Sequence, residues 1–317
     1  MTDNAFDFIR FPETSPVTYG IMGHSQFYKN TVQGSLILKL RVLTPVHVSA
    51  GISALGSDVG EASVPMVRPM VQAVDGKLVI QGSSLKGCVR SIYEVITNSQ
   101  CGTRSSAQVP QGYGPPIYNR KNDNNLCSAG NVFGAMGYQG LVSFSDAVCE
   151  GGSEIGYLRP MFLPKSGSRG GSTIGRKFYY HQKSVRRDEA SVVAVQQARV
   201  GSEFSTRIQI RNLGLDEFGA LLIALGLDDG CPIGLKIGAG KAQGMGSVRV
   251  VLAEMNVVES QNLVASRYQS YEVNCNKDDD LMGRAIAAAH DSLIHREQLD
   301  QLFEILKIDL FEIPKVD

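Results

Sequence analysis

Apolar and polar residues alternate along several short stretches of the chain, a pattern typical of β-strands that bury one face. In residues 34–43, the apolar residues Leu38, Leu40 and Val42 fall on the same face. Further stretches predict a hairpin that turns at Asp75-Gly76 and three later strands, in residues 65–80, 141–148, 204–210 and 247–255.

Other apolar residues recur at spacings of three and four, which predicts helices with one buried face. The first helix begins near Ser83 or Ser84, either of which can cap it, and runs to about Asn98. Residues 215–227 predict a second helix, and the end of the chain predicts one or two more. The buried positions of these last helices are Leu281, Ala285 and Ala289, followed by Leu299, Leu302, Phe303 and Leu306.

The order of these elements predicts an α+β protein with a ferredoxin-like β-α-β-β-α-β core, the plan that also underlies the RRM. We expect an N-terminal extension (1–34), a core domain (35–255) with insertions at about 99–131 and 157–187, and a helical tail (256–317). A tail of this kind can cover the core of its own chain or pack against a neighbour.

Charge is distributed unevenly, although the formal net charge is zero. Residues 157–187 hold eight Lys or Arg and no acid, whereas residues 277–317 hold ten acids and five bases. No apolar run approaches the length of a membrane helix, and no signal peptide is present, so we expect a cytoplasmic protein with no membrane partner. The six cysteines form no C-x-x-C pair, and a zinc site built on Cys101, Cys127 and a distant His is the alternative to reduced thiols.

Gly82-Ser83-Ser84-Leu85-Lys86-Gly87 opens the first predicted helix. Backbone amides, two hydroxyl groups and a helix N-terminus at one place favour a phosphate-binding site. Lys86 and Arg90 lie four residues apart and can neutralise more than one phosphate. The alternative is an ordinary capped helix with solvated basic residues.

A second candidate is the glycine-rich segment 238–246, which precedes the last predicted strand. Gly238, Gly240 and two further glycines allow positive φ angles and a close approach of the backbone to a ligand. Lys236 and Lys241 add positive charge. The spacing fits neither a P-loop nor a dinucleotide fingerprint, and a simple turn between helix and strand is the alternative.

The third candidate is the basic segment, in which cations and aromatic rings are interleaved. Arg176, Lys177 and Tyr179 are its central residues, followed by further bases up to Arg187. Cations combined with stacking rings suit single-stranded RNA. A solvated charged face is the alternative.

Taken in order, these segments resemble the RAMP (repeat-associated mysterious protein) superfamily of CRISPR systems over residues 35–255. Gly82–Gly87 resembles the family's first-helix motif, and Gly238–Gly246 its C-terminal glycine-rich loop. Leu126–Gly134 resembles a segment that ends in Phe-Gly, and Gly175–His181 is similar to a motif of some type III members.

The resemblance implies an RNA-binding domain in a backbone subunit of a type III effector complex, which acts in antiviral defence. Its partners would be CRISPR guide RNA, target RNA and other subunits of the complex. In that family the first-helix motif and the glycine loop hold the guide backbone, which needs no reading of bases because base pairing supplies specificity.

Members of the family that cut target RNA carry an aspartate two positions before a proline in the loop after the first strand. Pro65 looks like that proline, and the matching position is Ser63. A serine cannot replace the carboxylate in cleavage that depends on Mg²⁺ or Mn²⁺. Asp58 is therefore the candidate catalytic residue of an endoribonuclease, with Glu61 nearby. His47 follows the first strand and is a candidate for RNA contact or acid–base chemistry, or a structural histidine.

Two other functions remain open on the sequence. The first is a processing endoribonuclease of the same superfamily, with a histidine-based and metal-independent site. The second is an enzyme that binds a mononucleotide through the glycine loop and has no affinity for long RNA.

Overall fold

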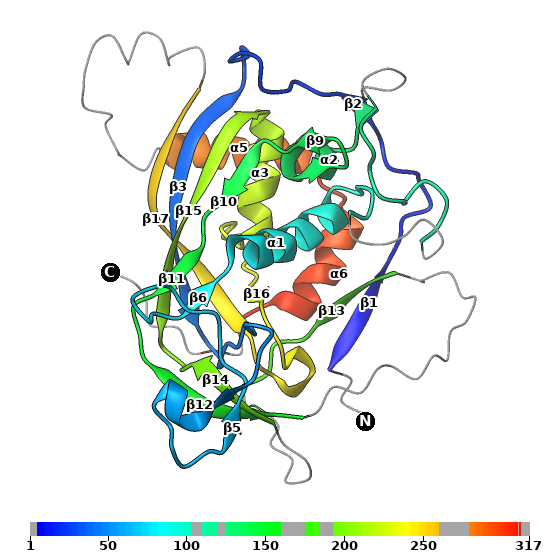
Figure 1. Cartoon of the computed structure of the whole chain (residues 1–317). Coiled ribbons are helices and arrows are strands. Elements are labelled where there is room, and N and C mark those ends of the chain that lie inside the picture. Colours follow the sequence, from blue (N-terminus) through cyan, green and yellow to red (C-terminus); the bar gives the residue numbers. More distant parts are fainter. Residues whose placement is uncertain are drawn as a thin grey trace, which may run out of the picture.

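A curled antiparallel sheet forms the centre of the protein in a computed structural model (Figure 1). The structure describes residues 5–102, 109–119, 125–159, 175–183, 185, 193–259, 279–309 and 311. The strand order of the sheet is β16-β17-β3-β15-β11-β6, and β10 pairs with β15 beside β11. The bounds are β3 Val32–Val42, β6 Val79–Ile80, β10 Val142–Phe144, β11 Ala147–Cys149, β15 Glu203–Leu213, β16 Leu235–Lys236 and β17 Ser247–Glu259.

The long strand β3 lies between β15 and β17 and carries the middle of the core. Leu38, Leu40 and Val42 alternate with more exposed residues and are buried, as the sequence pattern predicts. The predicted turn at Asp75-Gly76 is also confirmed, because Gly76 has a φ of 80° and Ala73 N donates to Lys77 O at 2.9 Å.

The helices gather on one face of the sheet (Figure 1). The bounds are α1 Gly82–Ile96, α2 Ser128–Phe133, α3 Leu215–Ala224, α5 Asp279–Ser292 and α6 Arg296–Leu306. The apolar positions predicted for the first helix are all buried, at Leu85, Val89, Ile92 and Ile96. The sequence did not predict α2, which begins inside the expected insertion at 99–131 and ends just beyond it.

Both tail helices pack on the chain's own core. Leu281, Ala285 and Ala289 of α5 are buried against α3. At Gly219 of α3 an added Cβ would lie 1.9 Å from Ala285 O, so the close approach of the two helices requires a glycine. The structure therefore shows that the tail covers the core of its own chain.

Short two-stranded pairings surround the sheet, and the sequence did not predict them. The N-terminal residues expected to form an extension supply two of these strands, which pair with β13 and β7. The pairs are β1 Phe6–Arg10 with β13 Gly175–Tyr179, β2 Tyr19–Gly20 with β7 Asn125–Leu126, β4 Ala54–Leu55 with β5 Met66–Val67, β8 Gly134–Ala135 with β9 Tyr138–Gln139, and β12 Ser153–Leu158 with β14 Val193–Ala198. The 3-10 helices are η1 Gly56–Val59 and η3 Lys241–Gln243.

The architecture is mixed α+β and is consistent with the predicted ferredoxin-like plan. Among the described residues, no helix is long and apolar enough to cross a membrane.

Candidate functional site

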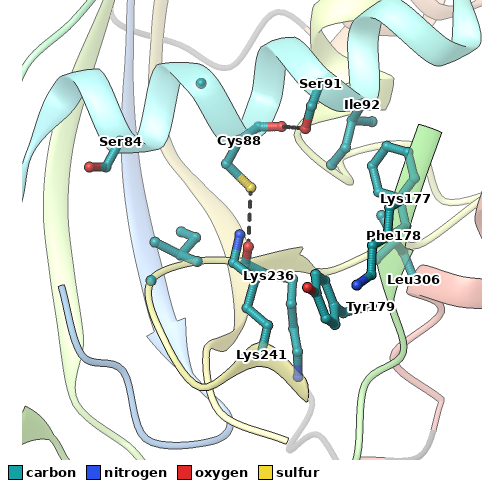
Figure 2. A pocket seen from close by; sticks show the side chains of 13 residues that line it. Ser84, Cys88, Ser91, Ile92, Lys177, Phe178, Tyr179, Lys236, Lys241 and Leu306 are labelled. Carbon is teal, nitrogen blue, oxygen red and sulfur yellow. Dashed lines mark hydrogen bonds between the residues drawn. The ribbon is translucent and has the colours of Figure 1, made fainter. Parts of the chain in front are cut away.

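Three segments that the sequence singled out meet at one pocket of about 430 Å³ (Figure 2). One side is the flank of α1, the second is the start of the glycine loop, and the third is β13. The lining residues are Ser84, Gly87, Cys88, Ser91, Ile92, Lys177, Phe178, Tyr179, Lys236, Ile237, Gly238, Lys241 and Leu306. Three of these are lysines and none is an acid, so the pocket favours an anionic group.

The flank of α1, rather than its N-terminus, faces the pocket. Ser84, Cys88 and Ser91 line it at helical spacing. The first amide of the helix, Gly82 N, already donates to Asp146 Oδ1 at 2.7 Å. The prediction that Ser83 or Ser84 caps the helix is wrong, because the N-cap is Gln81 and makes no side-chain cap.

Lys236 is buried in the wall of the pocket, with 5% of its surface exposed. Its Nζ donates to Gly244 O at 3.1 Å and to Ser247 Oγ at 2.9 Å. Burial, with a smaller contribution from the charge of Lys241, lowers the pKa of Lys236 to about 7. An anion in the pocket would favour the charged form of this side chain.

The glycine loop has the left-handed backbone that the sequence predicts, and His47 lies beneath it. Gly238 has a φ of 81°, and a Cβ there would lie 2.3 Å from His47 O. The same carbonyl accepts a hydrogen bond from Ala239 N at 2.9 Å. The His47 side chain is buried, its Nδ1 lies 2.7 Å from Gln196 O, and burial lowers its pKa. His47 therefore supports the loop and does not line the pocket.

Strand β13 separates the predicted basic residues between its two faces. Lys177 and Tyr179 line the pocket. Arg176 points into the core, where it donates to Glu94 O at 2.8 Å and to Ser99 O, and lies over the Phe11 ring. Its predicted role in RNA contact does not fit this burial. Arg186 and Arg187 of the same segment lie outside the described residues.

Lys86 and Arg90 face away from this pocket and line a second one of about 410 Å³, with Phe133 and Gly134. Lys86 Nζ donates to Val142 O at 3.1 Å, and burial lowers its pKa. Arg90 is held by Glu94 Oε1 at 2.8 Å and by Gly134 O at 2.9 Å. The predicted proximity of Lys86 and Arg90 is confirmed, but their side chains are already bound to the protein.

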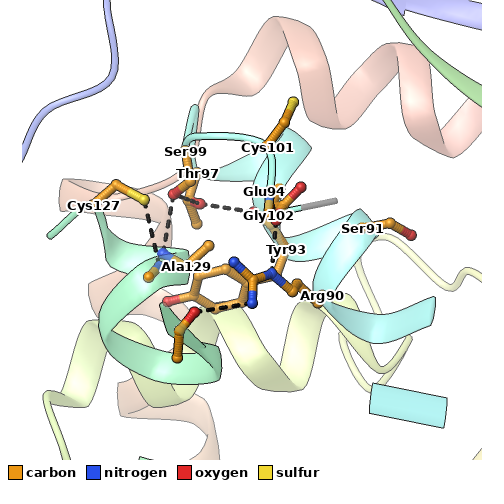
Figure 3. Close-up of polar contacts among 12 residues, drawn as sticks. Arg90, Ser91, Tyr93, Glu94, Thr97, Ser99, Cys101, Gly102, Cys127 and Ala129 are labelled. Atoms are coloured by element: carbon orange, nitrogen blue, oxygen red, sulfur yellow. Dashed lines mark hydrogen bonds and ion pairs between the residues drawn. The ribbon is translucent and has the colours of Figure 1, made fainter. Parts of the chain in front are cut away.

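The two candidate zinc-binding cysteines point to different partners near the end of α1 (Figure 3). Cys101 Sγ accepts from Arg176 Nε at 3.3 Å, and Cys127 Sγ accepts from Gly130 N at 3.4 Å as the N-cap of α2. Within the part of the chain that the structure describes, no three His, Cys, Asp or Glu side chains are grouped to hold a metal. The zinc hypothesis therefore finds no support in these residues.

Asp58 lies in η1, outside the pocket. Its side chain is exposed, and Oδ2 accepts from Leu55 N at 3.3 Å. No residue of the loop 49–65 lines the pocket between α1 and β13. Any role of Asp58 would concern a different part of a bound RNA.

Cys88, Ser91 and Leu306 also line the pocket, and the motifs in the sequence did not identify them. The first two lie four and seven residues after Ser84, so helical spacing could have identified them. No sequence signal connects Leu306 of α6 with the pocket. Cys88 Sγ lies 3.6 Å from Lys236 O, and burial raises the pKa of its thiol, so Cys88 is a neutral part of the wall.

A comparison with protein families agrees with the motifs. The family model described as RAMP superfamily matches residues 39–249, which is more than half of the chain and includes α1 and the glycine loop. A comparison with curated proteins finds no significant match.

Proposed function

The chain belongs to the RAMP superfamily, and from this we propose that it is a backbone subunit of a type III CRISPR effector complex that holds guide RNA by its phosphates. Family membership indicates a CRISPR-associated role in RNA binding, within a complex of RNA and other subunits. The type III assignment, the guide strand as ligand and the pocket as its site are the proposal.

The observation that carries the proposal is the meeting of the first-helix motif, the glycine loop and β13 at one pocket without acids. Lys177, Lys236 and Lys241 supply positive charge, and Ser84 supplies a hydroxyl donor. The Ser91 hydroxyl already donates to Cys88 O at 2.7 Å. Ammonium groups and hydroxyls bind phosphate oxygens and do not distinguish bases. That chemistry suits a guide strand, whose sequence is read by base pairing.

Backbone hydrogen bonds hold the glycine loop, which forms one wall of the pocket. Ile237 N donates to Gly246 O at 2.8 Å, and Met245 N donates to Gly240 O at 3.1 Å. The backbone that carries Lys236 and Lys241 is therefore ordered before RNA arrives, which lowers the entropy cost of binding.

Affinity for a single-stranded RNA of guide length, measured at several salt concentrations, tests the proposal. We expect Lys241→Ala to weaken binding and to lower the slope of log K against log salt by ~0.7, the value for one lost contact to a single strand. The matched control is the exposed Lys29, whose change to Ala should leave the slope unchanged. An unchanged slope for Lys241→Ala, together with tight binding of a mononucleotide, would favour the nucleotide-binding alternative instead.

Cutting of target RNA is a second, separate proposal that rests on Asp58. Asp58 and Glu61 could supply at most two carboxylates to Mg²⁺ or Mn²⁺, because no larger group of ligands exists among the described residues. Mg²⁺ is commonly held by one or two carboxylates together with phosphates and water. The residues therefore fit a metal only when RNA is bound.

A further inference from the structure

The ribbon formed by β1 and β13 has two chemically different faces. In its antiparallel register Phe6 lies opposite Tyr179, and Phe8 lies opposite Lys177. Directly opposed residues point to the same side of a ribbon, so these four share one face. The alternate pair, Ile9 and Arg176, is buried on the other face.

The first face is an aromatic surface with a cation on it. The Phe6 ring centroid lies 5.7 Å from that of Phe8 and 5.8 Å from that of Tyr179, and both pairs are edge-to-face, with interplanar angles of 90° and 65°. Lys177 Nζ lies 3.5 Å from the Phe6 centroid and 4.7 Å from the Tyr179 centroid. Phe8 is 43% exposed. A cation over a ring occupies the position that a nucleobase takes when it stacks.

This aromatic surface is continuous with the pocket between α1, the glycine loop and β13, because Lys177 and Tyr179 belong to both (Figure 2). Beyond Phe8 the charge changes sign. The groove between β1 and α6 is lined by three acids, Asp7, Glu297 and Glu304, and by one base, Arg10. A polyanion would therefore be repelled on the α6 side and attracted toward Lys177.

We propose that Phe6 and Tyr179 form an aromatic platform for an unpaired nucleobase of the RNA whose phosphate occupies the pocket, in which the base stacks on the face of one ring and the inclined second ring meets its edge. Lys177 leaves the rings when the base stacks, and its ammonium group moves to the adjacent phosphate. The ligand class is single-stranded RNA, since a base inside a duplex has no free face to offer. This inference rests on the proposed function of the pocket.

Half of the platform comes from outside the matched family region. Phe6 precedes residues 39–249, whereas Tyr179 lies within them. The N-terminal strand thus adds to the site a ring that the matched region does not contain.

A fluorescent base provides the test. The chain has no tryptophan, so 2-aminopurine in a single-stranded uridine RNA can be excited selectively. We expect protein binding to change the fluorescence of 2-aminopurine at one position of the RNA. An abasic nucleotide at that position should weaken binding to the unmodified protein by ~10-fold, the effect of losing one stacked base.

The test variant combines two substitutions, Phe6→Leu and Tyr179→Leu. A second variant, Tyr179→Phe, keeps the ring. The double variant should lose the fluorescence change and bind ~10-fold more weakly, and Tyr179→Phe should behave like the unmodified protein. The exposed Phe27, changed to Leu, is the control for loss of a surface ring elsewhere.

The possible outcomes distinguish failure of the platform proposal from failure of the proposed function of the pocket. If abasic RNA binds as tightly as intact RNA while Lys241→Ala still weakens binding, the platform is overturned and the proposed function stands. If the double variant loses a co-purified protein and keeps its RNA affinity, the ribbon is a protein interface and the inference is likewise overturned. If Lys241→Ala also has no effect, both proposals fail.

Discussion

Replacement of Lys236 by methionine should make the stability of the protein less dependent on pH. Methionine keeps most of the side-chain volume and removes the buried ammonium group. Lys236 has a pKa of about 7 in the folded protein, against 10.5 for the free side chain. Between these two values the unfolded chain holds the proton and the folded chain does not, so the free energy of unfolding rises with pH.

The size of the effect follows from the two pKa values. At 1.36 kcal/mol for each unit, the contribution of Lys236 to the free energy of unfolding rises by about 2.5 kcal/mol from pH 6.5 to pH 9. In Lys236→Met this rise is absent. The variant also loses the hydrogen bonds to Gly244 O and Ser247 Oγ, at a cost of about 1–3 kcal/mol that does not depend on pH.

Urea unfolding of both proteins at pH 6.5 and pH 9 measures this difference. Other groups titrate in the same range, and the comparison of the two proteins removes their contribution. The exposed Lys29, changed to Met, is the matched control and should follow the unmodified protein at both pH values. A stability difference between Lys236→Met and the unmodified protein that is equal at the two pH values would refute the reasoning.

Two further predictions concern the glycine loop and the candidate carboxylate. Gly238→Ala should lower the free energy of unfolding by about 1–3 kcal/mol, because its φ is positive and the added Cβ meets His47 O; an unchanged urea midpoint would contradict this. Asp58→Ala should leave RNA affinity unchanged, since Asp58 lies outside the pocket, and should abolish any Mg²⁺- or Mn²⁺-dependent cleavage of a complementary target RNA by the assembled complex. Cleavage that persists in this variant would assign cutting to another residue or subunit.

The sequence by itself determined the main elements of the fold. The alternation in β3 and the three-and-four spacing in α1 express burial on one face, which is a local property of the chain. The sequence also identified the first-helix motif and the glycine loop, because glycines with a basic residue beside them form a pattern in a short stretch. In the glycine loop these glycines have positive φ. Phe6 and Leu306 leave no such pattern, since their roles depend on pairing and packing with distant residues.

Only the tertiary structure decided which of the charged candidates face solvent. Lys177 and Arg176 are neighbours in the sequence, yet one lines the pocket and the other is buried with Glu94. The pairing of β13 with β1 sets these orientations, because a strand sends successive side chains to opposite faces. Likewise, the rotation of α1 places Ser84 and Cys88 toward the glycine loop and Lys86 on the opposite side. Short motifs in the sequence supply the basic residues, and long-range packing selects which of them line the pocket.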